Sequence, residues 1–208
     1  LIGIFLRKKI SVLNPLLVSI IFVIAVIKIF HIDYETYNSG AKYISYLLTP
    51  ATVCLAIPLY RQISVLKEHA KEVFIGILAG VLASMGSILL MSYLFGLTHE
   101  QYVTLLPKSI TTAIGMGVSE ELGGIQTITV AVIIITGVLG NIIAEAVLKI
   151  FRIKEPVAKG LAIGTASHAI GTTKALEIGE IEGAMSSLSV AVAGLMTVIS
   201  ASIFANMM

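Results

Sequence analysis

Residues 164–174 combine side chains that can do chemistry in a stretch that a lipid-facing helix would not require. They read Gly-Thr-Ala-Ser-His-Ala-Ile-Gly-Thr-Thr-Lys. The glycines loosen a helix, the hydroxyls offer hydrogen bonds, and His168 and Lys174 offer proton chemistry or positive charge. Non-helical backbone inside a bilayer is tolerated only where it is buried in protein or lines a wet cavity. The stretch therefore predicts a binding site formed by Thr165, Ser167, His168 and Thr172, with helix breaks at Gly164 and Gly171.

A second polar stretch, Leu-Pro-Lys-Ser-Ile-Thr-Thr, covers residues 106–112. Pro107 can begin a helix, and the free N–H groups of a first helical turn attract anions. Lys108 adds a full positive charge there. We expect a carboxylate cradle built from Lys108, Ser109, Thr111 and Thr112. The alternative is that Lys108 extends to the outer membrane interface and binds nothing.

Prolines interrupt a third stretch, at Pro50 and Pro58. Each removes a backbone N–H, and each disfavours helix at the residue before it. A twice-broken span would present a half-helix N-terminus to a substrate near the bilayer centre, with Pro50 and Thr52 as binding residues. A simple kink is the alternative.

Other kinds of site are not indicated. His31, His69 and His99 fall in expected loops, so no metal site is predicted around His168. That histidine could equally be a structural residue bonded to neighbouring hydroxyls. No nucleophile elbow, phosphate loop or zincin motif occurs, and Ser167, adjacent in sequence to His168, would diverge from it on a helix. We expect neither an enzyme nor a cofactor.

The composition is that of a membrane protein. Of the 208 residues, 57% are hydrophobic and 12% charged, about half the charged fraction of a soluble domain, which is roughly 25%. The mean hydropathy is +0.99. A net charge of +2 gives no indication of nucleic-acid binding, and the lone Cys54 allows no disulfide within one chain.

The fold class expected is an all-α polytopic membrane protein in a single domain, 1–208. Stretches of roughly 20 apolar residues can span a bilayer. The start of the chain resembles the tail of a further apolar segment. We expect five to six full spans, including residues 15–30, 43–60, 73–97, 125–151 and 184–208.

Basic residues orient these spans. Cytoplasmic loops carry an excess of Lys and Arg, and residues 31–40 contain neither. Three basic clusters are therefore expected inside: Arg7, Lys8 and Lys9; Arg61, Lys67 and Lys71; and Arg152, Lys154 and Lys159. With this orientation, residues 104–122 must enter and leave on the outer side.

Residues 157–177 start inside, and they either return inside or cross with a break. We favour two re-entrant hairpins inserted from opposite faces, which suggests an inverted repeat, a frequent plan of secondary transporters. The alternative is that both segments are plain short helices in a bundle. Small-residue pairs such as Gly76/Gly80 and Gly160/Gly164 favour packing within the chain over a dimer face. Glu145 and Lys149, spaced i, i+4, predict a structural ion pair.

The motifs together resemble those of the LrgB/CidB family, in order along nearly the whole chain. In the family a proline often follows the two threonines at 111 and 112, whereas this chain has Ala113 there. The stretch around Lys108 is most similar to CidB-type members. The motifs are Leu-Asn-Pro at 13–15, Pro-Ala-Thr-Val at 50–53, Ile-Pro-Leu-Tyr at 57–60, residues 106–112, Gly-Gly-Ile at 123–125, and residues 158–168, 171–177 and 182–184.

The resemblance implies a protein of the bacterial plasma membrane, holin-like or antiholin-like, linked to murein hydrolase control, autolysis and programmed cell death. It implies a smaller LrgA- or CidA-type membrane partner. A plastid relative exchanges glycolate and glycerate, and some bacterial pairs resemble pyruvate uptake systems. Applied to this chain, the motifs select Pro50, Thr52, Pro107, Lys108, Ser109, Thr111, Thr112, Thr165, Ser167, His168, Gly171 and Thr172.

Two functions follow as hypotheses. The first is a secondary transporter of small monocarboxylates such as pyruvate, lactate or glycolate, coupled to protons or another ion, with His168 as one candidate proton carrier. The second is a holin-like pore or antiholin-like regulatory assembly that transports no specific substrate. Short holins need no broken helices or buried charges, so the sequence favours transport. The partners expected are a carboxylate, the small membrane protein, the lipid bilayer and a second copy of the chain in a dimer.

Overall fold

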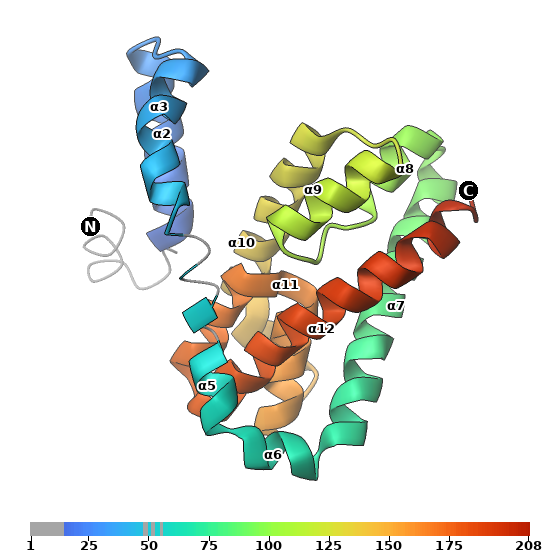
Figure 1. Ribbon diagram of the computed structural model, residues 1–208. Coiled ribbons are helices and arrows are strands. Elements are labelled where there is room, and N and C mark those ends of the chain that lie inside the picture. Colours follow the sequence, from blue (N-terminus) through green and yellow to red (C-terminus); the bar gives the residue numbers. More distant parts are fainter. Residues whose placement is uncertain (1–14, 48–49, 51–52, 55) are drawn as a thin grey trace. The chain divides into compact units, whose positions relative to one another are not determined.

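Helices make up all the regular structure that is described (Figure 1). The computed structural model describes residues 15–47, 50, 53–54 and 56–208. The chain divides into two compact units, Leu1–Cys54 and Leu55–Met208, and each is considered by itself.

The first unit contains α2 (Pro15–Ile29) and α3 (Tyr34–Ser45). The carboxylate of Asp33 caps α3 by accepting the N–H of Glu35 at 2.8 Å and the hydroxyl of Thr36 at 2.6 Å. The bonds from Thr36 lower the pKa of this carboxyl. α2 lies within the span expected at residues 15–30, but with 15 residues it is a shorter apolar helix than those long enough to cross a membrane. A turn follows α3 at residues 46–47, so the stretch 43–60 is not one continuous helix.

The second unit begins with short helices and continues with long ones. α5 (Ala56–Arg61) and α6 (Ile63–Glu68) lead into α7. Pro58 lies in the first turn of α5, where proline is compatible with a helix, so it does not interrupt that element. The remaining helices are α7 (Ala70–Phe95), α8 (His99–Leu105), α9 (Thr112–Glu121), α10 (Gln126–Ile150), α11 (Pro156–Ile178) and α12 (Glu180–Ala205).

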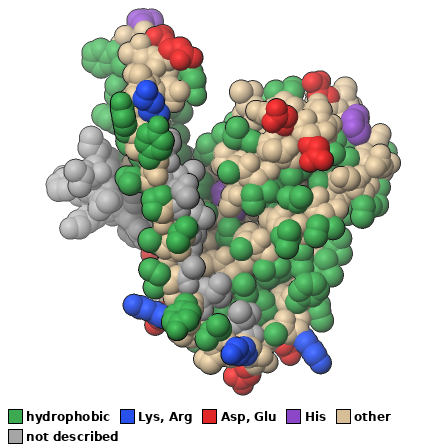
Figure 2. All heavy atoms as spheres, in the orientation of Figure 1, with side chains coloured by type: hydrophobic (Ala, Val, Ile, Leu, Met, Phe, Trp, Pro, Cys, Tyr) green, Lys and Arg blue, Asp and Glu red, His purple; other side chains and the backbone are tan. Residues whose placement is uncertain are grey.

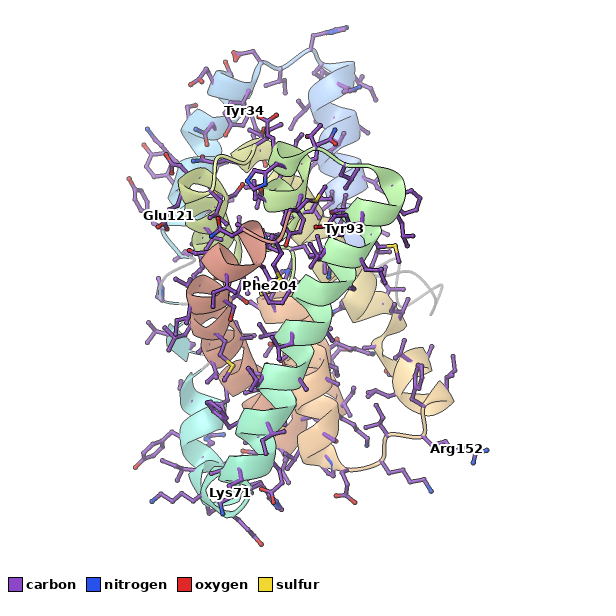
Figure 3. The ribbon with its side chains drawn as sticks, turned by 90° about the vertical axis from the view of Figure 1, so that its right-hand side faces the viewer. Tyr34, Lys71, Tyr93, Glu121, Arg152 and Phe204 are labelled. Atoms are coloured by element: carbon purple, nitrogen blue, oxygen red, sulfur yellow. The ribbon has the colours of Figure 1, made fainter. Side chains whose placement is uncertain are left out.

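Three of the described helices, α7, α10 and α12, are long and apolar enough to cross a membrane. They correspond to the spans expected at 73–97, 125–151 and 184–208. Lys71 and Arg152 lie at one end of this unit, and Tyr93 and Glu121 lie toward the other (Figure 3). On the visible face of this unit, hydrophobic side chains cover the middle and Lys and Arg gather at one end (Figure 2). The chain is thus a membrane protein built largely of helices.

α7 and α12 frame the core of the second unit. Val73, Ile77, Val81 and Met85 recur every four residues along α7 and are buried, because residues four apart share one face of a helix. At the far end, the hydroxyl of Tyr93 donates to the main-chain oxygen of Met207, so α12 ends beside α7 (Figure 1).

α11 contains a sharp break at His168, where φ is 43° and ψ is −146°. Ile163 and Ala175 nevertheless pack in one cluster with Ala144 and Leu148 of α10. In a straight helix these two residues would lie about 18 Å apart. The second half of α11 therefore folds back along the first.

The two ends of α11 lie at the same end of the bundle. Ile153 and Ile178 both pack on the cluster at Leu148, and Lys159, near the start of α11, forms an ion pair with Glu182 just after its end. Of the two paths open to residues 157–177, α11 takes the one that returns to its starting end.

α8 and α9 form the opposite element. The Thr104 hydroxyl accepts the N–H of Ile125 at 2.8 Å, and the Thr129 hydroxyl donates to the Thr104 main-chain oxygen at 2.9 Å. Residues 104 and 125 therefore meet where α10 begins, and the chain between them makes an excursion. The inverted repeat remains a prediction.

Candidate functional site

A small cavity lies between α11 and the turn that joins α8 to α9. It is lined by residues of α7, of the turn between α8 and α9, of α11 and of α12. The space open to the centre of a water molecule is about 10 Å³, which is close to the room for one water. Its polar lining residues are Ser84, Ser109, Thr165 and Thr197, and Pro107 lies at its wall.

The Lys108 ammonium lies beside this cavity. Its Nζ is 3.0 Å from Ser109 Oγ and 3.3 Å from Ser84 Oγ, and these two hydroxyls are 2.9 Å apart. Among the described residues no carboxylate lies within ion-pair distance of Lys108. Lys108 is half-buried, and a charge withdrawn from water is costly unless a partner compensates it. The arrangement therefore favours an anion as the partner of Lys108.

Thr165 contributes the α11 side of the cavity. Its hydroxyl donates to the Leu161 main-chain oxygen at 2.5 Å, a common back-bond of threonine in membrane helices. The lone pairs of the oxygen remain available to accept a bond. Thr165 and Ser109 were both predicted as site residues, and the structure brings them to one cavity.

His168 points elsewhere. Its ring Nε2 lies 2.9 Å from the main-chain oxygen of Ile133 in α10, and it does not line the cavity. Because a carbonyl oxygen only accepts, Nε2 must carry the proton. A Cβ on Gly137 would lie 2.7 Å from Cε1 of the ring, so this glycine makes the room that the imidazole occupies.

Ser167 and Thr172 also serve the break rather than the cavity. Ser167 packs so closely on Gly140 that a Cβ there would overlap its side chain. The Thr172 hydroxyl donates to the His168 main-chain oxygen at 3.1 Å and lies 2.8 Å from Ser186 Oγ of α12. Backbone freed by the break thus finds partners inside the protein, as the bilayer requires.

The other predicted residues take different positions. Thr111 is the N-cap of α9 and Thr112 its first residue, and neither lines the cavity. Pro50 belongs to the first unit, and Thr52 lies outside the described residues. Gly164 packs on the Ser186 backbone of α12. Gly171 packs on Ile163 where α11 folds back.

Lys174, the other cation of residues 164–174, is paired. Its Nζ lies 2.5 Å from Glu145 Oε1 and 3.3 Å from Glu177 Oε2. Lys149 joins Glu145 at 3.9 Å, which is the structural pair expected from their spacing. Among the described residues, no group of three or more His, Cys, Asp or Glu could hold a metal ion.

Sequence reasoning missed Ser84 and Thr197. Both lie within long apolar helices, where periodicity indicates a span and not a site. The available signal was that Ser84 continues the small-residue series Gly76–Gly80 at an interval of four.

The whole chain matches a known family. The model of the LrgB-like family matches residues 1–207. Antiholin-like protein LrgB of Bacillus mycoides (strain KBAB4) is 38% identical over 192 residues, which cover 92% of this chain and 84% of the relative. The proteins of the same name from Bacillus cereus (strain B4264) and Bacillus anthracis (strain CDC 684 / NRRL 3495) match with the same identity and coverage. No solved structure matches the chain significantly. The chain belongs to the LrgB-like family of membrane proteins.

Proposed function

We propose that the protein acts in the bacterial plasma membrane as a multi-pass antiholin-like protein, together with a small LrgA-type membrane protein, in the control of murein hydrolases. The names of the relatives support this cellular role, and they mention no transported substrate. The role requires no enzymatic step by this chain.

For the molecular activity we propose transport of small monocarboxylates of the pyruvate, lactate or glycolate class. One observation carries this proposal: the Lys108 ammonium rests on Ser84 and Ser109 at the edge of a cavity, with no carboxylate partner among the described residues. A carboxylate is small, singly charged and able to accept several hydrogen bonds, so it complements one ammonium and three or four hydroxyls.

The cavity is too small for a hydrated ion, and its walls come from α7, α11, α12 and the turn between α8 and α9. We therefore propose that it corresponds to a closed conformation, and that carboxylate binding requires the elements around it to separate slightly. Selective transporters need such closed states, because a binding site must not be open to both sides of the membrane at once.

The second candidate is a regulatory assembly that transports no specific substrate, and the names of the relatives favour it. The two candidates differ in two measurements on protein reconstituted into liposomes with its LrgA-type partner. Transport predicts saturable uptake of labelled pyruvate, lactate or glycolate with no release of a trapped dye. The second candidate predicts no saturable uptake, and in the form of a non-selective pore it also predicts dye release. Absence of saturable carboxylate flux with both proteins present would remove the transport proposal and leave the antiholin-like role standing.

A further inference from the structure

A second and larger hollow lies between α7 and the first half of α11. Its free space, measured for the centre of a water molecule, is about 500 Å³. Its lining runs from His69, Glu72 and Glu155, at the end of the bundle that carries Lys71 and Arg152 (Figure 3), inward to Thr165. Thr165 also lines the small cavity beside Lys108, so this residue borders both spaces.

Glycines on α7 create this groove. Gly76 and Gly80 face α11, where a Cβ would lie 3.4 Å from Leu161 Cδ1 and 3.1 Å from Thr165 Oγ1 respectively. Larger residues at these positions would fill the groove. Gly80 thus contacts Thr165, the residue that borders both the groove and the cavity.

Charge distinguishes the roles of the two spaces. The outer part of the groove carries Glu72 and Glu155, which would repel a resident carboxylate. The cationic Lys108 lies beyond Thr165, beside the cavity. The outer groove therefore disfavours a resting anion, and Lys108 favours one at the cavity.

We propose that this groove is the route by which a small carboxylate reaches the Lys108 cavity from the end of the bundle that carries Arg152, and that Thr165 is the partition on this route that limits substrate size. The identity of the ligand rests on the proposed transport function, whereas the route rests on the groove, the cavity and their shared residue. Gly80 lies in close contact with the Thr165 side chain, so passage of a carboxylate at this point requires α7 and α11 to separate slightly, as the closed conformation proposed above implies.

Cysteine accessibility tests the route without any need for flux. In a Cys54→Ser background, single cysteines are introduced as Ala162→Cys, in the exposed part of the groove, and as Thr165→Cys, at its inner end. A membrane-impermeant sulfonate-bearing thiol reagent is then added to vesicles of either orientation. We expect both cysteines to react from the Arg152 side, and Thr165→Cys to react at least about tenfold more slowly than Ala162→Cys.

Closing the groove provides the second measurement. Gly80→Val in the Thr165→Cys background should slow modification by roughly a further tenfold. Gly86→Val is the matched control, because a Cβ on Gly86 of the same helix meets no atom within 4 Å, and it should leave the rate unchanged. If Thr165→Cys fails to fold, Gly80→Cys reports on the same constriction from α7.

Labelling of position 165 or 80 only from the opposite side, or no labelling while Ala162→Cys reacts, would overturn the route. Slower labelling of Thr165→Cys in the presence of pyruvate would support both the route and the carboxylate ligand. Labelling from the Arg152 side with no effect of any carboxylate would support the route and count against the proposed ligand, so the two ideas fail separately.

Discussion

The imidazole of His168 in α11 is joined to the backbone of Ile133 in α10, with Nε2 2.9 Å from the carbonyl oxygen. The side chain of Ile133 also lies against Gly115 of α9, where a Cβ would overlap its Cδ1. One residue of α10 thus contacts both elements that fold back on themselves. His168 holds the tip of one of them in place.

The backbone of His168 predicts an unusual order of stability among its variants. Both His168→Ala and His168→Gly lose the bond to Ile133, worth about 1 kcal/mol. Only glycine readily adopts φ 43° with ψ −146°, and the conformation costs other residues about 1–3 kcal/mol. We expect His168→Gly to unfold at a higher temperature than His168→Ala in detergent. Equal melting temperatures would show that the backbone at this position carries no such cost.

A further substitution separates structure from proton coupling. The side-chain amide of His168→Gln can still donate to the Ile133 carbonyl but does not titrate near neutral pH. Because His168 does not line the cavity, we expect the variant to retain carboxylate flux with an unchanged pH profile in liposomes. Loss of proton-driven flux with normal folding would instead assign the proton to His168.

The two lysines of the polar stretches should respond differently to removal. Lys108→Ala takes away the charge beside the cavity, and we expect a loss of about 1.5–3 kcal/mol in carboxylate binding, or roughly 10–150-fold in apparent affinity. Lys174→Ala removes a charge already paired with Glu145 and Glu177, and affinity should hold. Titration of the purified protein with pyruvate measures both. Equal losses in the two variants would argue against a specific role for Lys108.

Close packing between α11 and α12 can be tested at Gly164. A Cβ there would overlap the Ser186 main-chain oxygen and the Ser189 hydroxyl, so Gly164→Ala should destabilise the protein by about 1–3 kcal/mol. Gly86→Ala is the control, since a Cβ at that position meets nothing within 4 Å. It should be neutral or stabilising by up to about 1 kcal/mol, because alanine favours helix. Denaturant titration of both variants, monitored by circular dichroism, compares the two.

Charge and polarity in the sequence were sufficient to predict much of this arrangement. The basic clusters predicted that residues 157–177 start inside, and of the two possible paths we favoured a hairpin that returns inside. α11 does return to its starting end, where Lys159 is paired with Glu182. Ser109 was predicted as part of a cradle and lines the cavity. Pro107 also lines it, but it lies in the turn before α9 and does not begin a helix as predicted. Thr111 and Thr112, predicted for the same cradle, do not line the cavity. These residues carry local signals, because a proline or a charge is conspicuous in an apolar chain.

The direction of each side chain was not available from the sequence. His168 and Thr165 lie one turn apart, yet Thr165 faces the cavity and His168 faces α10. The break at His168 changes the helical phase between them, so spacing alone misplaces the ring. Ser84 was overlooked for a related reason, since its role depends on a lysine 24 residues away that reaches it through space.

The outer element is held by a buried hydroxyl cluster that allows a double-mutant test. The Thr129 hydroxyl donates to the Thr104 main-chain oxygen at 2.9 Å and lies 2.7 Å from Ser119 Oγ, joining α8 and α9 to α10. Thr129→Val leaves Ser119 buried without this partner, so we expect a destabilisation of about 1–3 kcal/mol. The exposed Thr127, two residues earlier in α10, supplies the control Thr127→Val, which should change stability little.

Removing both partners should cost less than the sum of the single changes. Ser119→Ala in the Thr129→Val protein removes the hydroxyl that the first substitution left unpaired, and groups in contact couple by about 0.5–3 kcal/mol. Unfolding free energies of the four proteins in the cycle give the coupling directly. Strict additivity would mean that this bond does not fasten α9 to α10, and that the turn carrying Lys108 is positioned by the apolar contacts of α9 alone.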